Sequence, residues 1–157
     1  MPDDRNGFLR AAVISGLLAG AATGIVVAVR GARDSGSAVA PINATSHVAW
    51  GEEAAGVRAV DVKHTALGAA IHAAAGVFWA GVYEKLFGRH AERGNLTKAL
   101  AGGAAVAALA YVTDYHLVPK RLTPGWEARV SGRSLAVTYA ALAASLPLRA
   151  LLRRRAA

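Results

Sequence analysis

The sequence contains no cysteine, and it contains none of the short motifs that mark common catalytic sites. The absence of cysteine excludes disulfides, iron–sulfur clusters and thiolate metal sites, so His, Asp and Glu are the only strong metal ligands that remain. The chain also lacks a GxSxG elbow, a Walker loop, a dinucleotide fingerprint and any paired-carboxylate spacing. These absences argue against an enzyme.

Charged residues are scarce, at 18% of the chain, and they are unevenly placed. The net charge is +8 and the pI is near 10.6, but the Lys and Arg residues lie almost wholly between and beyond long apolar segments. A basic protein of this pattern is expected to meet anionic lipid headgroups rather than nucleic acid.

Four apolar segments approach the length of about 20 residues that a helix needs to cross a bilayer. The segment from 8 to 29 is the clearest, because no charged residue lies between Arg10 and Arg30. The other three run approximately over 64–86, 96–118 and 134–152, and Pro119 ends the third. Pro147 is expected to bend the fourth near its end.

A soluble helical bundle is the alternative, but its helices would each need a polar face that repeats about every 3.6 residues. The first segment is apolar or small all the way round. We therefore predict an all-α fold in which residues 1–157 form a single four-helix transmembrane bundle.

The distribution of Lys and Arg at the ends of the segments predicts the orientation in the membrane. Ten of the 18 fall on the side of the two termini and eight on the other, and the run from Arg153 to Arg155 directly follows a segment. We expect both termini to lie in the cytoplasm.

Glycines recur at helical spacing in the first two segments. Gly16, Gly20 and Gly24 form a double GxxxG pattern, and Gly68 and Gly76 flank His72 in the second segment. Glycines at this spacing let two helices approach closely, so we expect packing against another helix of the chain or against a second copy.

Two loops on the predicted outer side contain tryptophan. The loop APINATSHVAWG over 40–51 mixes apolar and polar residues, and Pro41 is suited to open a short helix that is partly embedded at the outer mouth of the bundle. Trp50 in this loop and Trp126 in the basic loop over 115–133 suit the membrane interface.

Ionisable residues within or beside the segments form the candidate functional cluster, because a lone charge in lipid is costly. The members of this cluster are His47, His64, His72, Asp114 and His116. A metal ion or haem could be held by His72 with His116 or His47, supported by Asp114, although no spacing such as HExxH is present. The alternative, which we prefer, has no cofactor, a His72 that forms a hydrogen bond to a Ser, Thr or Tyr on a facing helix, and His64 and His116 among the lipid headgroups.

Glu84 lies near the cytoplasmic end of the second segment. It suggests either a local ion pair with Lys85 or a proton path from Glu84 through His72 to Asp114. Arg149, in the last turn of the fourth segment, is expected to extend its charged head to the interface.

The segment HTALGAAIHAAAGVFWAGVYEKLFG and the loop PINATSHVAWG resemble small bacterial inner-membrane proteins of the YagU-like group. The likeness covers residues 40 to 130 and consists of a His within the second segment, followed by an aromatic residue and then Tyr and Glu. This resemblance implies a four-helix inner-membrane protein. It does not assign a biochemical activity to any residue, because no activity is established for the group.

Three functions remain open on these observations. The leading expectation is a structural or regulatory membrane partner, or an envelope stress protein, that acts as a homo-oligomer or with another membrane protein. The alternatives are a metal- or haem-binding protein that uses the outer histidines, and a proton-linked channel or transporter.

Overall fold

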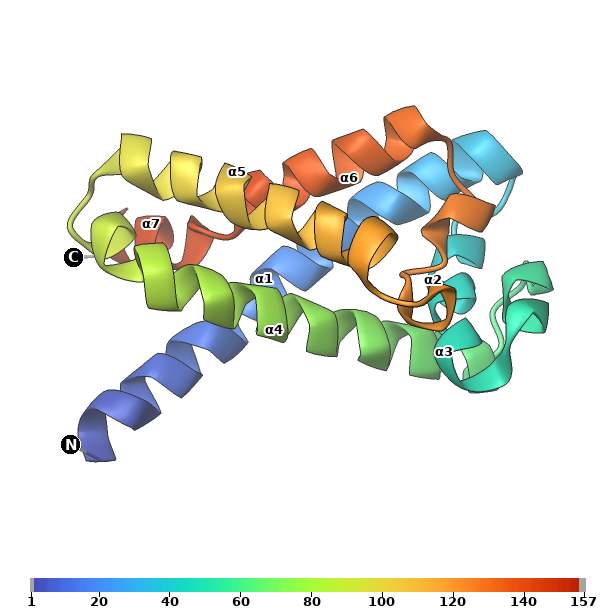
Figure 1. Cartoon of the computed structure of the whole chain (residues 1–157), viewed down its shortest axis with the longest axis horizontal. Coiled ribbons are helices and arrows are strands. Elements are labelled where there is room, and N and C mark those ends of the chain that lie inside the picture. The colour runs from blue at the N-terminus through green and yellow to red at the C-terminus, as the bar shows by residue number, and fades with distance from the viewer. Residues whose placement is uncertain (1, 156–157) are drawn as a thin grey trace.

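The computed structural model describes residues 2–155, and this part of the chain contains helices and no strands. The long helices are α1 (Pro2–Ser35), α4 (Leu67–Glu92), α5 (Leu96–Val112) and α6 (Gly132–Ser145), and α6 is continued by α7 (Leu148–Arg155). Figure 1 shows them running along the long axis of the molecule, with both termini at the same end. The predicted all-α four-helix bundle is confirmed.

Four stretches are long and apolar enough to cross a membrane: Arg5–Ser35, Val62–Glu92, Leu96–Leu117 and Gly132–Arg154. The first two extend beyond the predicted segments, each reaching 31 residues. At about 1.5 Å per residue, such a helix is about 46 Å long and exceeds the ~30 Å hydrocarbon core. The N-terminal turns of α1 project from the bundle accordingly (Figure 1).

The helix ends follow from local side-chain chemistry. Asn95 and Ser131 stand just before α5 and α6, and their side chains accept hydrogen bonds from the backbone N–H groups of Lys98 and Ser134. Gly94 permits the sharp turn between α4 and α5, because its φ of 77° lies in the left-handed region. Pro147 separates α6 from α7, as the sequence predicted.

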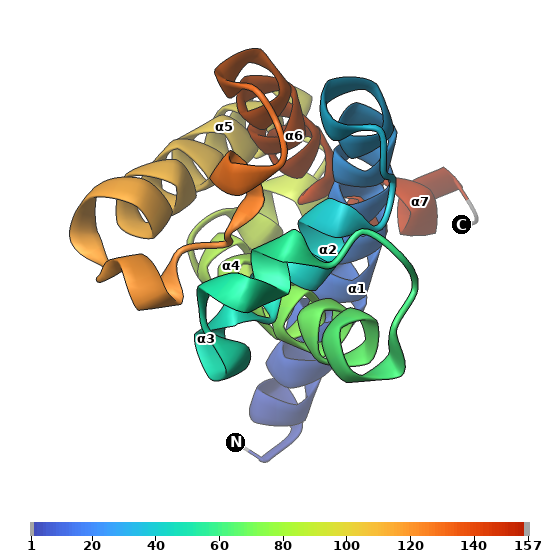
Figure 2. The same ribbon diagram turned by 90° about the vertical axis from the view of Figure 1, so that its right-hand side faces the viewer.

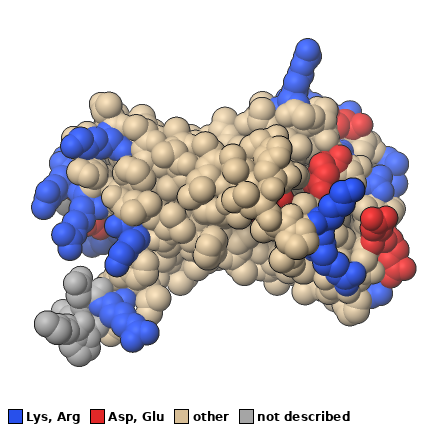
Figure 3. All heavy atoms as spheres, in the orientation of Figure 1, with Lys and Arg blue, Asp and Glu red and all other residues tan. Residues whose placement is uncertain are grey.

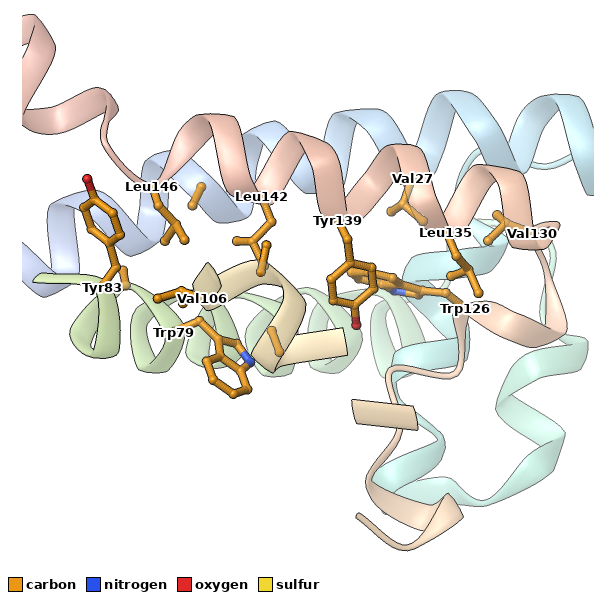
Figure 4. Packing of buried hydrophobic residues seen from close by; sticks show 14 residues of the cluster. Val27, Trp79, Tyr83, Val106, Trp126, Val130, Leu135, Tyr139, Leu142 and Leu146 are labelled. Atoms are coloured by element: carbon orange, nitrogen blue, oxygen red, sulfur yellow. The ribbon is translucent and has the colours of Figure 1, made fainter. Parts of the chain in front are cut away.

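The four long helices form a closed arrangement, since α1 packs against α4 and α6, and α5 packs against the same two helices. Aromatic and branched side chains fill the space between them (Figure 4).

Small residues line the contact between α1 and α4. A Cβ atom added to Gly76 would lie 2.9 Å from the carbonyl oxygen of Gly16, and one added to Gly16 would collide with the backbone of Val77. Gly20 has more room, with Ala73 Cα 4.0 Å away. Gly24 faces the His72 ring, and Gly68 lies against the carbonyl of Ile42.

A cap of short helices closes the end of the bundle opposite the termini, which we call the cap end. It contains α2 (Ala40–Thr45), α3 (His47–Trp50), η1 (Glu52–Gly56), η4 (Lys120–Leu122) and η5 (Trp126–Ala128). Figure 2 looks onto this end and shows α2 and α3 in front of α4 and α1. Pro41 stands in the first turn of α2, as predicted.

Asn43 of α2 is fully buried and holds the cap together. Its Nδ2 donates to the carbonyls of Val57 and Ala59 at 3.0 and 2.9 Å, and its Oδ1 accepts from Thr65 Oγ1 at 2.6 Å. One side chain therefore ties the returning loop and the start of the second span to α2.

On the face shown in Figure 3, Lys, Arg, Asp and Glu gather at the two ends of the molecule, and the wide middle between them is largely free of charged residues. Large apolar side chains on the outer helix faces are exposed, including Ile25 at 66% and Phe78 at 61%. Exposed large apolar side chains on the long helices would be unfavourable in water and match the hydrocarbon of a membrane.

Candidate functional site

Two polar clusters lie inside the bundle, one at each end. The first surrounds His72 at the cap end, and we call it the outer cluster. The second surrounds Glu84 and Arg149 at the end with the termini, and we call it the inner cluster. The sequence analysis named His72 and Asp114 of the outer cluster and Glu84 of the inner cluster, and it missed Thr23 and Tyr139 of the outer cluster and Ser15 and Glu92 of the inner one.

His72 projects from α4 towards α1. Its Nε2 lies 2.9 Å from the carbonyl oxygen of Gly20 and 3.2 Å from Thr23 Oγ1. A carbonyl oxygen can only accept, so Nε2 carries the hydrogen and donates it to Gly20. The imidazole is thereby a helix-to-helix hydrogen-bonding group, although its shorter contact is to a backbone carbonyl rather than to the Ser, Thr or Tyr side chain that the sequence predicted.

Asp114 lies in η3 (Thr113–Leu117), a wide final turn that continues α5. Its Oδ2 accepts a hydrogen bond of 2.6 Å from the hydroxyl of Tyr139 on α6. Tyr139 also packs edge-on against Tyr111 and lies near Tyr115. The three tyrosines therefore form one aromatic group, and the hydroxyl of Tyr139 binds the carboxylate.

Trp126 was expected to anchor the outer loop at the membrane interface, and that expectation is wrong. Its side chain is only 6% exposed, and its Nε1 donates to Thr45 Oγ1 at 3.1 Å. The ring packs against His72, with centroids 5.5 Å apart, and against Tyr139. Gly125, directly before it, has a φ of 78°, in the left-handed region that favours glycine.

These groups line a cavity of about 100 Å³ between the bundle and the cap. Its walls are mainly apolar, and the polar groups that reach it include Thr23, His72, Asp114 and Tyr139. Trp79 and Trp126 form two of its aromatic walls. A small cavity with apolar walls and a few convergent polar groups has the character of a ligand site, although most ligand pockets are roughly three times larger or more.

The other predicted histidines do not reach this cavity. His47 places Nδ1 2.9 Å from the carbonyl of Ala44 and Nε2 3.0 Å from that of Lys120, so it joins α2 to η4. His116 packs edge-on against Tyr111. Within the described residues, no three His, Asp or Glu side chains are grouped to hold a metal ion, so His47, His72 and His116 do not form a ligand set here.

His64 binds the carboxylate of Asp61, which also accepts from the backbone N–H of Lys63 at 2.9 Å. The hydrogen bond from His64 and the one from Lys63 hold the pKa of Asp61 below its usual value of 3.8. This pair belongs to the start of the second span rather than to the cavity.

The inner cluster is centred on a buried ion pair. Arg149 Nε and Nη2 bind the two carboxylate oxygens of Glu84 at 3.0 and 2.9 Å, and both side chains are only 5% exposed. Ser15 of α1 donates to Glu84 at 2.5 Å, and Glu92 accepts from Arg149 at 2.8 Å. This cluster joins α1, α4 and α7.

Two expectations from the sequence are corrected by this cluster. Arg149 does not extend to the interface, and Glu84 pairs with Arg149 rather than with Lys85, which is exposed. The signal was present in Pro147, because the turn it imposes redirects the next residues towards α4. Spacing along the chain could not reveal a pair that is 65 residues apart.

Packed side chains separate the two clusters. Glu84 and His72 are 12 positions apart on α4, which corresponds to about 18 Å. Along the bundle between Tyr83 and Tyr139, Figure 4 shows Leu146, Val106, Leu142 and Trp79. All of these side chains are buried.

Comparisons with protein-family models, with curated proteins and with solved structures gave no match.

Proposed function

We propose that this chain is a non-enzymatic, multi-pass protein of a bacterial inner membrane that acts as a structural or regulatory partner of other membrane components, including in envelope stress. The observation that carries the proposal is that His72, Asp114 and Glu84, the three titratable candidates inside the bundle, each bind a group on another helix. Such pairing holds helices together in an apolar environment and presents no reactive group to a substrate.

The filled core supports this role over a proton-linked channel. A path from Glu84 to His72 needs water or further titratable groups along about 18 Å. The residues that occupy this interval include Trp79, Val106 and Leu142, which cannot carry a proton. Glu84 is also engaged by Arg149 and Ser15 at that end.

The contact between α1 and α4 supports a packing role for the predicted GxxxG pattern. Gly16 and Gly76 lie against each other's helices so closely that neither accommodates a larger residue without movement. The partner of this pattern is then a helix of the same chain, which leaves the exposed outer faces for lipid or for another protein.

The charge distribution supports the orientation with both termini in the cytoplasm. The end that carries the termini has ten of the 18 Lys and Arg residues, whereas the cap end has eight. Cytoplasmic ends of membrane helices are enriched in Lys and Arg, so the cap end faces outwards. The resemblance to the YagU-like group is consistent with this inner-membrane assignment.

A flux assay in sealed liposomes with a pH-sensitive dye tests the non-transport role. We expect the wild-type protein to give no more proton flux than protein-free liposomes. A flux that His72→Ala or Glu84→Gln removes would overturn the proposal in favour of a transporter. Photo-crosslinking from Phe78 and Ile25 on the outer faces then tests the partner role, and we expect a reproducible protein adduct from one face only.

A second candidate function is binding of a small ligand in the cavity beside His72, and the cavity itself favours it. The expected ligand is a small, mainly apolar molecule with one group that hydrogen-bonds to Asp114 or His72. Metal or haem is less well supported, because the Nε2 of His72 already faces Gly20. A visible spectrum and an elemental analysis of the purified protein test this ranking. A haem band or stoichiometric metal that is present in the wild type and absent in His72→Ala would favour metal or haem over the small apolar ligand.

A further inference from the structure

A groove opens between the start of α1 and α7, at the end of the molecule that carries both termini. Its volume is about 450 Å³. The groove walls are the apolar side chains of Ala11, Ile14, Leu18 and Leu152, and the arginines Arg10 and Arg153 also line it. Neither polar cluster described above explains it.

The groove exists because α7 does not continue the line of α6. Pro147 interrupts the helix, and α7 then diverges from the long, projecting α1. At the mouth of the groove, a Cβ atom added to Gly7 would meet no other atom within 4 Å, so this side is open. Arg149 also lines the groove, but its guanidinium is held by Glu84 and Glu92.

The remaining two arginines have the chemistry of a phosphate site. Arg10 and Arg153 are both exposed and line the same groove from different helices. Guanidinium binds phosphate oxygens through paired N–H donors. Figure 3 shows that Lys and Arg dominate this end, which gives an anion further attraction.

The walls of the groove are those of an acyl-chain site. Ile14 and Leu18 follow Arg10 by one and two turns of α1, so they extend about 12 Å from the charged rim towards the middle of the span. Ile14 and Leu152 are exposed to this space. A free phosphate would use the rim alone, whereas a phospholipid would use the rim and the walls together.

We propose that this groove binds one anionic phospholipid, with its phosphate between Arg10 and Arg153 and an acyl chain along Ile14, Leu18 and Leu152. The position suits this ligand, because the rim lies where a span ends and where lipid headgroups begin. Basic pockets between membrane helices bind anionic lipid headgroups by this combination of charge and apolar surface. The site is independent of the proposed partner role.

Native mass spectrometry of the detergent-purified protein tests the proposal. The protein is incubated with phosphatidylglycerol, with phosphatidylcholine of the same chains, or with inorganic phosphate. We expect one retained phosphatidylglycerol, at least tenfold weaker retention of phosphatidylcholine, and no displacement of the lipid by millimolar phosphate. Displacement by phosphate would mean an anion site without acyl specificity and would overturn the lipid assignment.

Matched variants locate the site. Arg10→Gln combined with Arg153→Gln should weaken phosphatidylglycerol binding by about thirtyfold, from the contribution of two basic residues near an anionic headgroup. The control pair, Lys120→Gln with Arg133→Gln, removes the same charge at the cap end and should leave binding unchanged. Equal losses in the two pairs would show a general charge effect and would overturn the site.

A third variant tests the role of the apolar groove separately from the role of the two arginines. Ala11→Trp fills the groove while both arginines remain, and it should prevent retention of the lipid. Its melting temperature in lipid-free detergent should match that of the wild type, because Ala11 lines an open groove. Undiminished lipid binding by a folded Ala11→Trp protein would show that the acyl chain does not lie in the groove and would overturn the proposal.

Discussion

Loss of the Arg149 side chain should be among the most destabilising single changes in this protein. In Arg149→Met, the Glu84 carboxylate stays only 5% exposed and keeps Ser15 as its remaining donor. Removing one partner of a buried ion pair costs about 3–5 kcal/mol, because the other charge is left uncompensated. The exposed Glu92 adds little, since a half-exposed ion pair contributes roughly 0–1 kcal/mol.

A double variant tests whether the cost comes from the unpaired charge. Glu84→Leu combined with Arg149→Met replaces both charged groups by apolar side chains in a helix contact. Such replacements of a buried pair are often neutral or stabilising. We therefore expect the double variant to recover most of the free energy that Arg149→Met loses.

Unfolding in mixed micelles, titrated with a denaturing detergent and followed by circular dichroism, measures these free energies. Arg89→Met is the matched control, because it removes an exposed arginine from the same end of α4 and should change stability by less than about 0.5 kcal/mol. An Arg149→Met protein as stable as that control would refute the reasoning. So would a double variant no more stable than Arg149→Met.

Three further changes test the rest of the fold. Gly16→Ala should destabilise the protein by about 1–3 kcal/mol, because the added methyl group meets the backbone of α4. Gly20→Ala should be neutral or stabilising, because the added methyl group has room. Detergent unfolding compares the two variants. Tyr139→Phe should cost roughly 1.5–3 kcal/mol in the same assay, through the lost hydrogen bond to the Asp114 carboxylate, and an unchanged midpoint would contradict that bond. The lowered pKa of Asp61 means that its charged form stabilises the fold above pH 3.8 and that this contribution is lost as the pH falls through the lower folded-state pKa. Asp61→Asn should therefore melt below the wild type at neutral pH and approach it in acid.

The helices themselves could be predicted because their cause is local. A bilayer-length run without charges, such as the one after Arg10, must satisfy its backbone hydrogen bonds within itself and so forms a helix. Pro41 opens a short helix and Pro147 interrupts a long one for equally local reasons, since proline lacks the N–H donor.

Side-chain partners could be predicted only where the alternatives were few. A hydrogen bond from His72 to a neighbouring helix could be expected, but its shorter contact, to the backbone carbonyl of Gly20 rather than to a hydroxyl, could not. The direction of Trp126 was predicted wrongly, because a tryptophan in a basic loop suits either the interface or a buried place beside a hydroxyl acceptor. The position of Thr45, 81 residues earlier, decided between them.

The sequence by itself determined the approximate positions of the four long helical segments, the charge at the two ends and the apolar belt between them, since each depends on residues adjacent along the chain. Only the tertiary structure decided that Glu84 pairs with Arg149, that His72 and Asp114 share a cavity without His47 or His116, and that Arg10 and Arg153 meet at one groove. The physical reason is that these contacts depend on how helices from distant parts of the chain are rotated and crossed, and many rotations bury similar apolar surface. Close contact at Gly16 and pairing at Arg149 distinguish one arrangement from the others.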